Sequence, residues 1–246
     1  MNNKTLVLYW REPTTREWIV VGKLWKQDSE YRFCYTKGVK RAEENGNFAL
    51  FGQMNEKDKT YISNELFPIF KNRLLQKSRP EYQEYLQWLG LDSSLEALDE
   101  LSRTNGVRAT DSLQLFEVPT ESEGKYVTYF FSHGISHLPK NYVERIKDLK
   151  KDDRLYLMQD IQNRIDHYAL MIRTDDPAEL MGYCPRIYTR DLNTLIKAND
   201  ARNVYLTIET INHDAPLQFR LLCKLETKWF DGFKPFKDID FQEYGK

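Results

Sequence analysis

The sequence has few of the residues that cross-link a chain or bind metal. Only three cysteines occur among 246 residues, and Cys34, Cys184 and Cys223 lie far apart without forming a CxxC pair. An odd number at such spacing argues against a disulfide framework or a zinc cluster. We therefore expect reduced, buried thiols, which is the usual state of cysteine in a cytoplasm.

Long apolar segments and a strong net charge are also missing. No stretch approaches the roughly 20 apolar residues that span a bilayer, and the N-terminal MNNKTLVLYW lacks the apolar core of a signal peptide. The 36 basic and 37 acidic residues give a formal net charge of −1. We therefore expect a cytoplasmic protein without membrane contact, in which any binding of nucleic acid depends on local groups rather than on overall charge.

Catalytic motifs are absent as well. The sequence contains no G-x-S-x-G, no GxxxxGK[ST] loop and no HExxH helix. His133 and His137 are four residues apart, but they flank Gly134 directly after a predicted strand, where helical geometry for a metal pair is not expected. We predict that the protein is not an enzyme and has no cofactor or bound metal, with an unrecognised nuclease or other enzyme as an alternative.

What the sequence does contain is typical of a folded protein, with 41% hydrophobic, 30% charged and 13% aromatic residues. In the first fifty residues apolar side chains alternate at residues 6–10 and 31–35, and residues 18–21 form a β-rich run, which predicts three strands. Predicted turns separate these strands, so we expect an antiparallel meander. The turns fall at residues 12–14, Gly22, Gly38 and 45–47.

The pattern then becomes helical. Apolar residues recur at three- and four-residue steps over residues 63–91, with Ser63 as the expected N-cap. Pro80 divides this segment into two helices, and Gly90 ends the second. A third helix is expected at residues 94–103, before a polar stretch rich in turn residues.

The segment VPTESEGK at residues 118–125 has the composition of a domain boundary. After it we expect a small β-rich domain with inserted helices, hence an α+β chain overall. The predicted domains are residues 1–117, 124–230 and a C-terminal tail, 231–246. The predicted strands of the second half lie at residues 126–131, 154–158, 168–172, 204–208 and 219–225, and its predicted helices at 141–149 and 188–197.

This second half resembles a HIRAN domain over about residues 124–230. The family pattern has a strand, a D-P-x-N-x-x-D-like turn, an A-[ILV]-x-[ILV] strand and G-[YH]-[ILVC]-P before a helix. The upstream FFSHGI at residues 130–135 resembles the first strand and turn of the family. The matching residues are Asp160, Asn163, Asp166, Ala169, Leu170, Gly182, Tyr183 and Pro185.

The resemblance implies a small β-barrel of the OB or SH3-like kind and binding of single-stranded DNA ends. It places Asn163 and Asp166 where the family contacts the terminal nucleotide, with Tyr183 beside that pocket and His137 available to stack. An alternative is that Asn163 and Asp166 only stabilise a turn. Candidate phosphate contacts are Lys150, Lys151 and Arg154, which are interleaved with acidic residues.

Two positions depart from the DNA-end binders of the family. These have an aromatic residue where Ile165 stands, and a basic–aromatic pair where Ser136 and His137 stand. The resemblance therefore implies a pocket that lacks part of its usual aromatic lining.

The first half resembles the N-terminal subdomain of HipA-like proteins, through VGKLWKQDSEYRFCYTKG and ELFPIFKNRLLQKSRPEYQEYLQWLGL. The kinase catalytic region of HipA is not expected in the remaining residues. Two functions are left open. The first is a non-catalytic adaptor that binds single-stranded DNA, DNA ends or RNA. The second is a protein-interaction module, such as an antitoxin-like or regulatory subunit of a HipA-type kinase or a defence complex.

Overall fold

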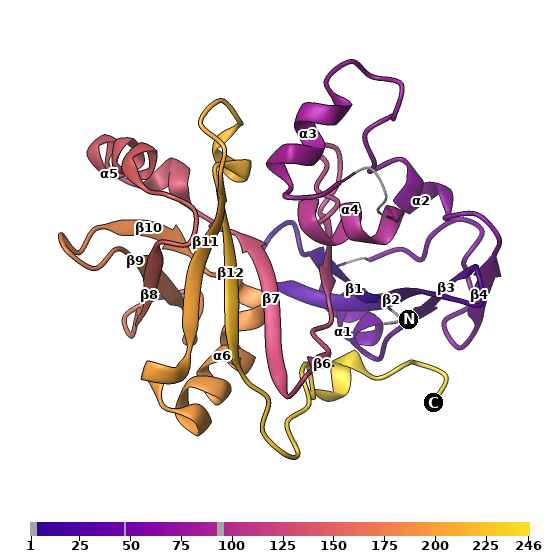
Figure 1. The fold of residues 1–246 in the computed structure, drawn as a ribbon. Coiled ribbons are helices and arrows are strands. Elements are labelled where there is room, and N and C mark those ends of the chain that lie inside the picture. The colour runs from indigo at the N-terminus through magenta and orange to yellow at the C-terminus, as the bar shows by residue number, and fades with distance from the viewer. Residues whose placement is uncertain (1–3, 47, 93–95) are drawn as a thin grey trace. The chain divides into compact units, whose positions relative to one another are not determined.

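The structure, a computed structural model, describes residues 4–46, 48–92 and 96–246. It divides the chain into two compact units of mixed helix and antiparallel sheet (Figure 1). Each unit is built from segments that are distant in sequence. Unit 1 contains Met1–Tyr82, Ser94–Val118 and Lys234–Lys246, and unit 2 contains Gln83–Ser93 and Pro119–Phe233.

Unit 1 has a five-stranded antiparallel sheet with strand order β4-β3-β2-β1-β5. The predicted meander forms its centre, because the alternating apolar residues of these strands face a common core. The strands are β1 (Thr5–Arg11), β2 (Trp18–Gln27), β3 (Glu30–Tyr35), β4 (Thr60–Ser63) and β5 (Leu113–Glu117).

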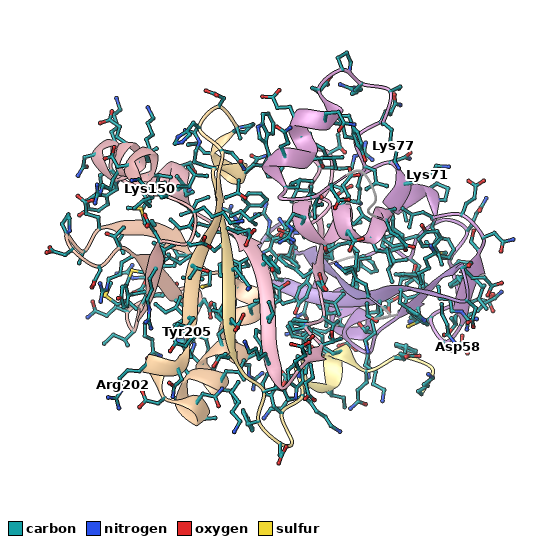
Figure 2. The ribbon with its side chains drawn as sticks, viewed as in Figure 1. Asp58, Lys71, Lys77, Lys150, Arg202 and Tyr205 are labelled. Carbon is teal, nitrogen blue, oxygen red and sulfur yellow. The ribbon has the colours of Figure 1, made fainter. Side chains whose placement is uncertain are left out.

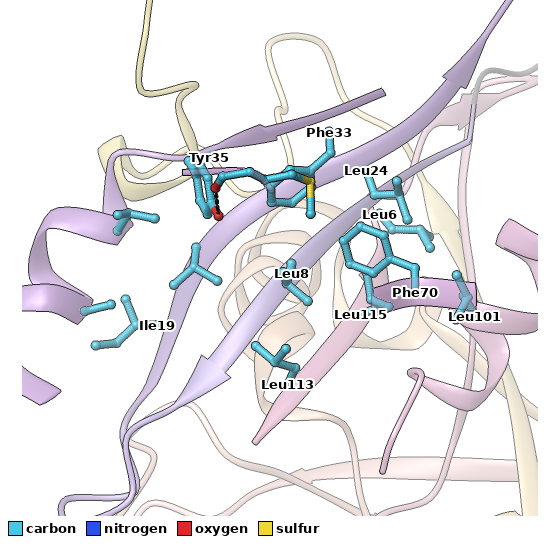
Figure 3. Close-up of a cluster of buried hydrophobic side chains, with 14 of the residues drawn as sticks. Leu6, Leu8, Ile19, Leu24, Phe33, Tyr35, Phe70, Leu101, Leu113 and Leu115 are labelled. Atoms are coloured by element: carbon cyan, nitrogen blue, oxygen red, sulfur yellow. Dashed lines mark hydrogen bonds between the residues drawn. The ribbon is translucent and has the colours of Figure 1, made fainter. Parts of the chain in front are cut away.

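The core of unit 1 gathers side chains from this sheet and from the segments packed on it (Figure 3). Leu6, Leu8 and Phe33 are fully buried in it. The Tyr35 hydroxyl, also buried, donates to the Met54 carbonyl at 2.6 Å and accepts from a backbone N–H at 2.8 Å. The only polar atom of this side chain is therefore satisfied, and its burial costs little.

The helices of unit 1 differ from the prediction. Helix α1 (Gly38–Gly46) occupies a region where only turns were expected, and α2 is a short helix, Pro68–Lys71, after strand β4. Ser63 belongs to that strand and is not a helix N-cap. Helix α3 (Tyr82–Trp88) ends near Gly90, whose positive φ of 63° suits a helix C-terminus. Helix α4 (Ala97–Thr104) overlaps the third predicted helix, whose start lies outside the described residues.

A buried arginine follows α2 and ties the chain there to a distant segment. The side chain of Arg73 is 1% exposed and pairs with Asp111 at 2.6 Å. It also donates to the Gly106 carbonyl at 2.7 Å and to the Ile69 carbonyl at 3.1 Å. These contacts join the chain after α2 to the polar stretch before β5, a long-range link that local periodicity cannot reveal.

The C-terminal segment folds onto unit 1. The Tyr244 N–H donates to the Tyr35 carbonyl at 2.9 Å, and the Lys37 N–H donates to the Gln242 carbonyl at 2.8 Å. The short 3₁₀ helix η5 (Ile239–Phe241) directly precedes Gln242 and Tyr244 in sequence. Residues that were predicted as a tail thus add backbone pairing to unit 1.

Unit 2 has a seven-stranded antiparallel sheet with strand order β10-β9-β8-β11-β12-β7-β6. The predicted strands of the second half are present, whereas β6 and β10 were not expected. The strands are β6 (Glu121–Ser122), β7 (Lys125–Phe131), β8 (Arg154–Gln159), β9 (Leu170–Arg173), β10 (Leu180–Tyr183), β11 (Tyr205–Ile211) and β12 (Leu221–Lys228).

The expected barrel is not confirmed, because the strand order is linear and neither sheet of the described residues closes. An isolated β-bridge between His133 and Tyr183 does bring β10 to the chain that leaves β7. The mixed α+β class is confirmed. The helices of unit 2 are η1 (Ile135–His137), α5 (Lys140–Arg145), η2 (Ile146–Asp148), α6 (Arg186–Asn199), η3 (Ala201–Asn203) and η4 (Leu217–Phe219).

The three cysteines are free and buried, as predicted. Burial raises the pKa of Cys34 to about 12 and raises the pKa values of Cys184 and Cys223 well above the usual range. All three thiols therefore stay protonated at neutral pH. Within the described residues, no helix combines the length and the apolar character that a membrane span requires.

Candidate nucleic-acid interface

In the turn between β8 and β9, both the amide oxygen and the amide nitrogen of Asn163 form hydrogen bonds within the turn. The amide oxygen accepts from the N–H groups of Ile165 and Asp166, both at 3.0 Å. The amide nitrogen donates to an Asp160 carboxylate oxygen at 2.9 Å. An Asn that bonds nearby backbone in this way stabilises a turn, so the structural role considered for Asn163 is present in the fold.

Asp166 connects the same turn to helix α6. One carboxylate oxygen accepts from the Tyr168 N–H at 2.9 Å, and the other accepts from the Thr189 hydroxyl at 3.1 Å. Asn193, one turn further along α6, donates to the Tyr168 carbonyl at 3.0 Å. The side chain of Asp166 is thereby oriented, and each oxygen of a carboxylate can accept a further hydrogen bond.

Tyr183 joins this group from strand β10. Its hydroxyl donates to the Asp160 carboxylate at 3.2 Å, to the same oxygen that accepts from Asn163. Burial, together with the nearby charge and hydrogen bond of Asp160, raises the pKa of Tyr183, so the hydroxyl stays a donor at neutral pH. Sequence reasoning named Asp160 only as part of the turn motif, and its position between the two other side chains comes from the fold.

His137 is exposed at the end of η1. No hydrogen bond joins its side chain to Asn163, Asp166 or Tyr183 in the part of the chain that the structure describes. The neighbour that contacts the group is His133, whose backbone exchanges two hydrogen bonds of 2.9 Å with Tyr183. The turn therefore brings together Asn163, Asp166 and Tyr183, while His137 stands apart as an exposed ring.

Exposed apolar side chains surround the turn. Ile161 is 79% exposed, Ile165 is 76% exposed and Tyr168 is 44% exposed. Large apolar groups at such exposure commonly mark binding surfaces when they cluster. Sequence reasoning identified Ile165 only as a departure from the family and did not identify the exposure of Ile161.

The three predicted phosphate contacts differ in their surroundings. Lys150 is exposed (Figure 2). The ammonium group of Lys151 lies 2.9 Å from a Glu209 oxygen, and the hydrogen bond and charge of Glu209 raise the pKa of this lysine. Arg154 is exposed at the start of β8, and its guanidinium packs on two tyrosine rings. Lys151 therefore has its charge balanced locally, whereas Arg154 forms no ion pair with any residue that the structure describes.

Metal-ligating side chains do not gather into a site in the part of the chain that the structure describes. In residues 4–46, 48–92 and 96–246, no group of three or more His, Cys, Asp or Glu side chains is arranged to hold a metal ion. The polar turn is a set of hydrogen-bonding groups, suited to recognising a ligand by donors and acceptors.

Comparison with known proteins finds one family model that matches part of the chain. Residues 125–228 match the family model of the HIRAN domain. HIRAN domains are generally DNA-binding modules, and the match supports nucleic-acid binding by unit 2. The resemblance of the first half to a HipA-like subdomain stays a prediction.

No curated protein matches the chain. Among solved structures, a crystal structure of a protein from Lactobacillus plantarum, a structural-genomics target, is 16% identical. The similarity covers 42% of this chain and 96% of that one, with a TM-score of 0.33.

Proposed function

We propose that the chain is a non-catalytic adaptor that binds nucleic acid, specifically single-stranded DNA or DNA ends, through its HIRAN domain. The observation that carries this proposal is the meeting of Asn163, Asp166 and Tyr183 around one polar turn in the region that matches the family. The oriented carboxylate of Asp166 would accept a hydrogen bond from a terminal 3′ hydroxyl. The exposed ring of Tyr168 in the turn, and that of His137 apart from it, would stack on bases.

Cations near the same strand supply the phosphate contacts of this proposal. Lys150, Lys151 and Arg154 precede or begin β8, the strand that leads into the turn. A few such contacts suffice for a chain of near-neutral net charge, because each neutralised phosphate releases bound counterions.

The test is a fluorescence-anisotropy titration with short labelled single strands that carry a free or a phosphorylated 3′ end, at about 50 and about 200 mM salt. We expect salt-dependent binding that is lost when the 3′ end is blocked. Asp166→Asn keeps the shape of the side chain and one acceptor oxygen, for the Tyr168 N–H, but it places an amide donor against the Thr189 hydroxyl oxygen and removes the charge. Its affinity for a free end should fall about 10-fold or more, because a charge-assisted hydrogen bond contributes about 1.5–3 kcal/mol.

The matched control is Asp214→Asn, the same chemical change at an exposed position of unit 2. It should bind like the wild type. Binding that is changed neither by the 3′ block nor by Asp166→Asn would contradict an end pocket at Asp166. A wild-type protein that binds no strand would contradict the function itself and direct the search to protein partners.

A further inference from the structure

Two arginines and two tyrosines alternate on the sheet of unit 2, a feature outside the polar turn. The Arg154 guanidinium carbon lies 4.7 Å from the ring centre of Tyr205 and 5.3 Å from that of Tyr156. The Arg173 guanidinium carbon also packs on Tyr156, at 4.9 Å from the ring centre. We call Tyr205, Arg154, Tyr156 and Arg173 the arginine–tyrosine ladder.

The ladder crosses three neighbouring strands, β11, β8 and β9. Successive side chains of a strand point to opposite faces of the sheet. Leu155, between Arg154 and Tyr156, is 2% exposed, and Ile172, before Arg173, is fully buried. The ladder therefore lies on the face opposite to the core, and Tyr205 at one end is 47% exposed.

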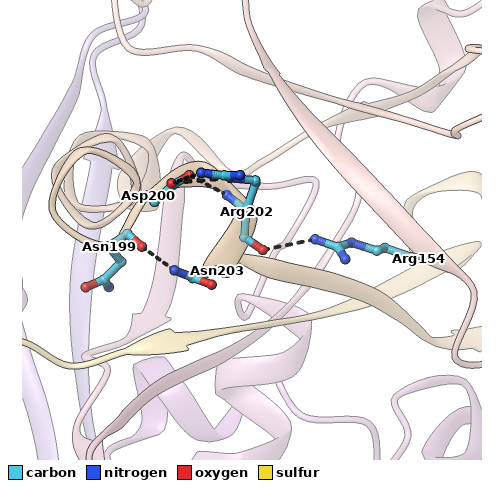
Figure 4. Close-up of polar contacts among 5 residues, drawn as sticks. All are labelled: Arg154, Asn199, Asp200, Arg202 and Asn203. Carbon is cyan, nitrogen blue, oxygen red and sulfur yellow. Dashed lines mark hydrogen bonds and ion pairs between the residues drawn. The ribbon is translucent and has the colours of Figure 1, made fainter.

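The charge of Arg154 is not balanced by an acid. Within the described residues its side chain forms no ion pair, and its one hydrogen bond goes to the Arg202 carbonyl at 3.3 Å (Figure 4). Neighbouring cations do have partners: Arg202 pairs with Asp200 at 2.9 Å and Lys151 with Glu209, also at 2.9 Å. Cation–π packing alone explains the flat stacking of Arg154, but it leaves most of the N–H donors of this guanidinium without an acceptor.

The other end of the ladder meets one acidic side chain. Arg173 donates to the Thr174 carbonyl at 2.7 Å and lies 4.0 Å from an Asp175 oxygen. The Tyr156 hydroxyl donates to Asp175 at 3.4 Å. Asp175 is 70% exposed, so water screens its charge, and the free cationic edge of the ladder is that of Arg154.

A row of uncharged side chains connects the ladder with the polar turn. Met158 is paired with Met171, and Met171 is paired in turn with Tyr183. Strand β8 runs from Arg154 to the residue before Asp160, a path of about 20 Å at roughly 3.3 Å per residue. The thioether side chains of this row can lie against bases without repelling phosphates.

We propose that the arginine–tyrosine ladder is a strand-tracking surface for single-stranded nucleic acid, on which a base stacks on Tyr205 and phosphates bind the guanidinium of Arg154. The ladder extends the contact of a strand whose end lies at the polar turn, so this inference rests on the proposed function. An aromatic ring accepts any base by stacking, and a planar guanidinium binds phosphate through paired N–H donors.

The test varies strand length, because only a strand that passes beyond the turn reaches the ladder. Wild type, Tyr205→Ala, Arg154→Gln and Arg154→Lys are titrated with labelled oligothymidylates of about 3 and about 12 nucleotides. Each ladder variant should bind the longer strand about 5- to 50-fold more weakly, and Tyr205→Ala should bind the shorter strand like the wild type. Arg154→Lys should fall between the wild type and Arg154→Gln, since it keeps the charge and loses the planar stack.

Salt dependence gives a second readout that a merely structural role would not change. Arg154→Gln should lower the slope of log affinity against log salt by about 0.7, the value for one single-strand phosphate contact. Arg108→Gln, the same charge change at an exposed position of unit 1, is the matched control and should leave the slope unchanged. Both ladder positions are exposed, and thermal unfolding verifies that the variants fold.

Comparing the affinity for oligouridylate with that for oligothymidylate of the same length tells whether the strand is RNA or DNA.

Three results are distinguishable. Weaker binding of the long strand only, with a smaller salt slope, supports the ladder. Long-strand binding at wild-type affinity in Tyr205→Ala and Arg154→Gln, while Asp166→Asn is weakened, overturns the ladder and leaves the end pocket standing. A wild-type protein that binds neither strand overturns the proposed function and the ladder with it.

Discussion

Several side chains of unit 2 combine a structural contact with a free face. Asp166 bonds the Tyr168 N–H and the Thr189 hydroxyl, yet its carboxylate keeps capacity for another donor. Arg154 is packed between two rings and keeps unpaired N–H groups. Such residues are best tested by changes that keep the shape, because truncation would confuse loss of folding with loss of binding.

His133 provides a test of stability against pH. Burial lowers the pKa of its imidazole from 6.5 to about 4. Between these two values the unfolded chain binds more protons than the folded chain, so folding stability falls as the pH drops. We expect the full free energy of unfolding of unit 2 at neutral pH, and a loss of at most about 3 kcal/mol between pH 6.5 and pH 4.

The measurement is urea unfolding at several pH values across this window. His133→Gln removes the titrating group and should flatten the pH dependence relative to the wild type. His213→Gln changes an exposed histidine of the same unit and should keep the wild-type profile. An unaltered profile in His133→Gln would refute this assignment.

Among the elements, β10 depends on a glycine. Gly182 has a φ of +121°, and a Cβ at this position would lie 2.1 Å from the Ser132 Oγ and 2.5 Å from the His133 carbonyl oxygen. The close approach allows Ser132 to donate to the Met181 carbonyl at 2.7 Å and the backbones of His133 and Tyr183 to pair. The glycine thus permits the bridge that brings Tyr183 to the turn.

We expect Gly182→Ala to lower the free energy of unfolding of unit 2 by about 2–4 kcal/mol, from the combined clash and backbone strain. Gly124→Ala is the control, since Gly124 also has a positive φ, +74°, but has nothing near its Cβ position. It should cost about 1 kcal/mol. Chemical denaturation of both variants measures the difference, and equal losses would show that the close approach does not matter.

At the scale of the whole molecule, the two units are interleaved along the chain. The segment Gln83–Ser93 precedes part of unit 1 in sequence but belongs to unit 2. Leu89 is fully buried there with Phe131 and Leu222, and Asn212 donates to the Trp88 carbonyl at 2.8 Å. Neither the HIRAN match at 125–228 nor the predicted domain at 124–230 includes this segment.

Leu89→Ala should therefore destabilise unit 2, by about 2–5 kcal/mol for a buried leucine. Hydrogen exchange in the full chain should show faster exchange in β7 and β12 and unchanged exchange in β1 and β2. Leu101→Ala, at a fully buried position in the core of unit 1, should give the reverse. Faster exchange in β1 and β2 from Leu89→Ala would contradict the assignment of this segment.

The sequence by itself determined what depends on neighbours along the chain. Alternation predicted β1 and β3, a β-prone run predicted β7, and Asp160, Asn163 and Asp166 indicated a HIRAN-like turn in the segment that matches the family model. Side-chain period and turn chemistry are local properties, so a single sequence displays them.

The tertiary structure decided what depends on residues far apart in sequence. Strand β5 is short and pairs with β1 across about a hundred residues, and the turn predicted at Gly38 begins helix α1, where Val39 and Ala42 are buried. The contacts of Asp160 with Tyr183 and of Arg154 with Tyr205 join separate strands. Local periodicity carries no information about which strands pair, so these contacts became visible only when the sheet of unit 2 brought them together.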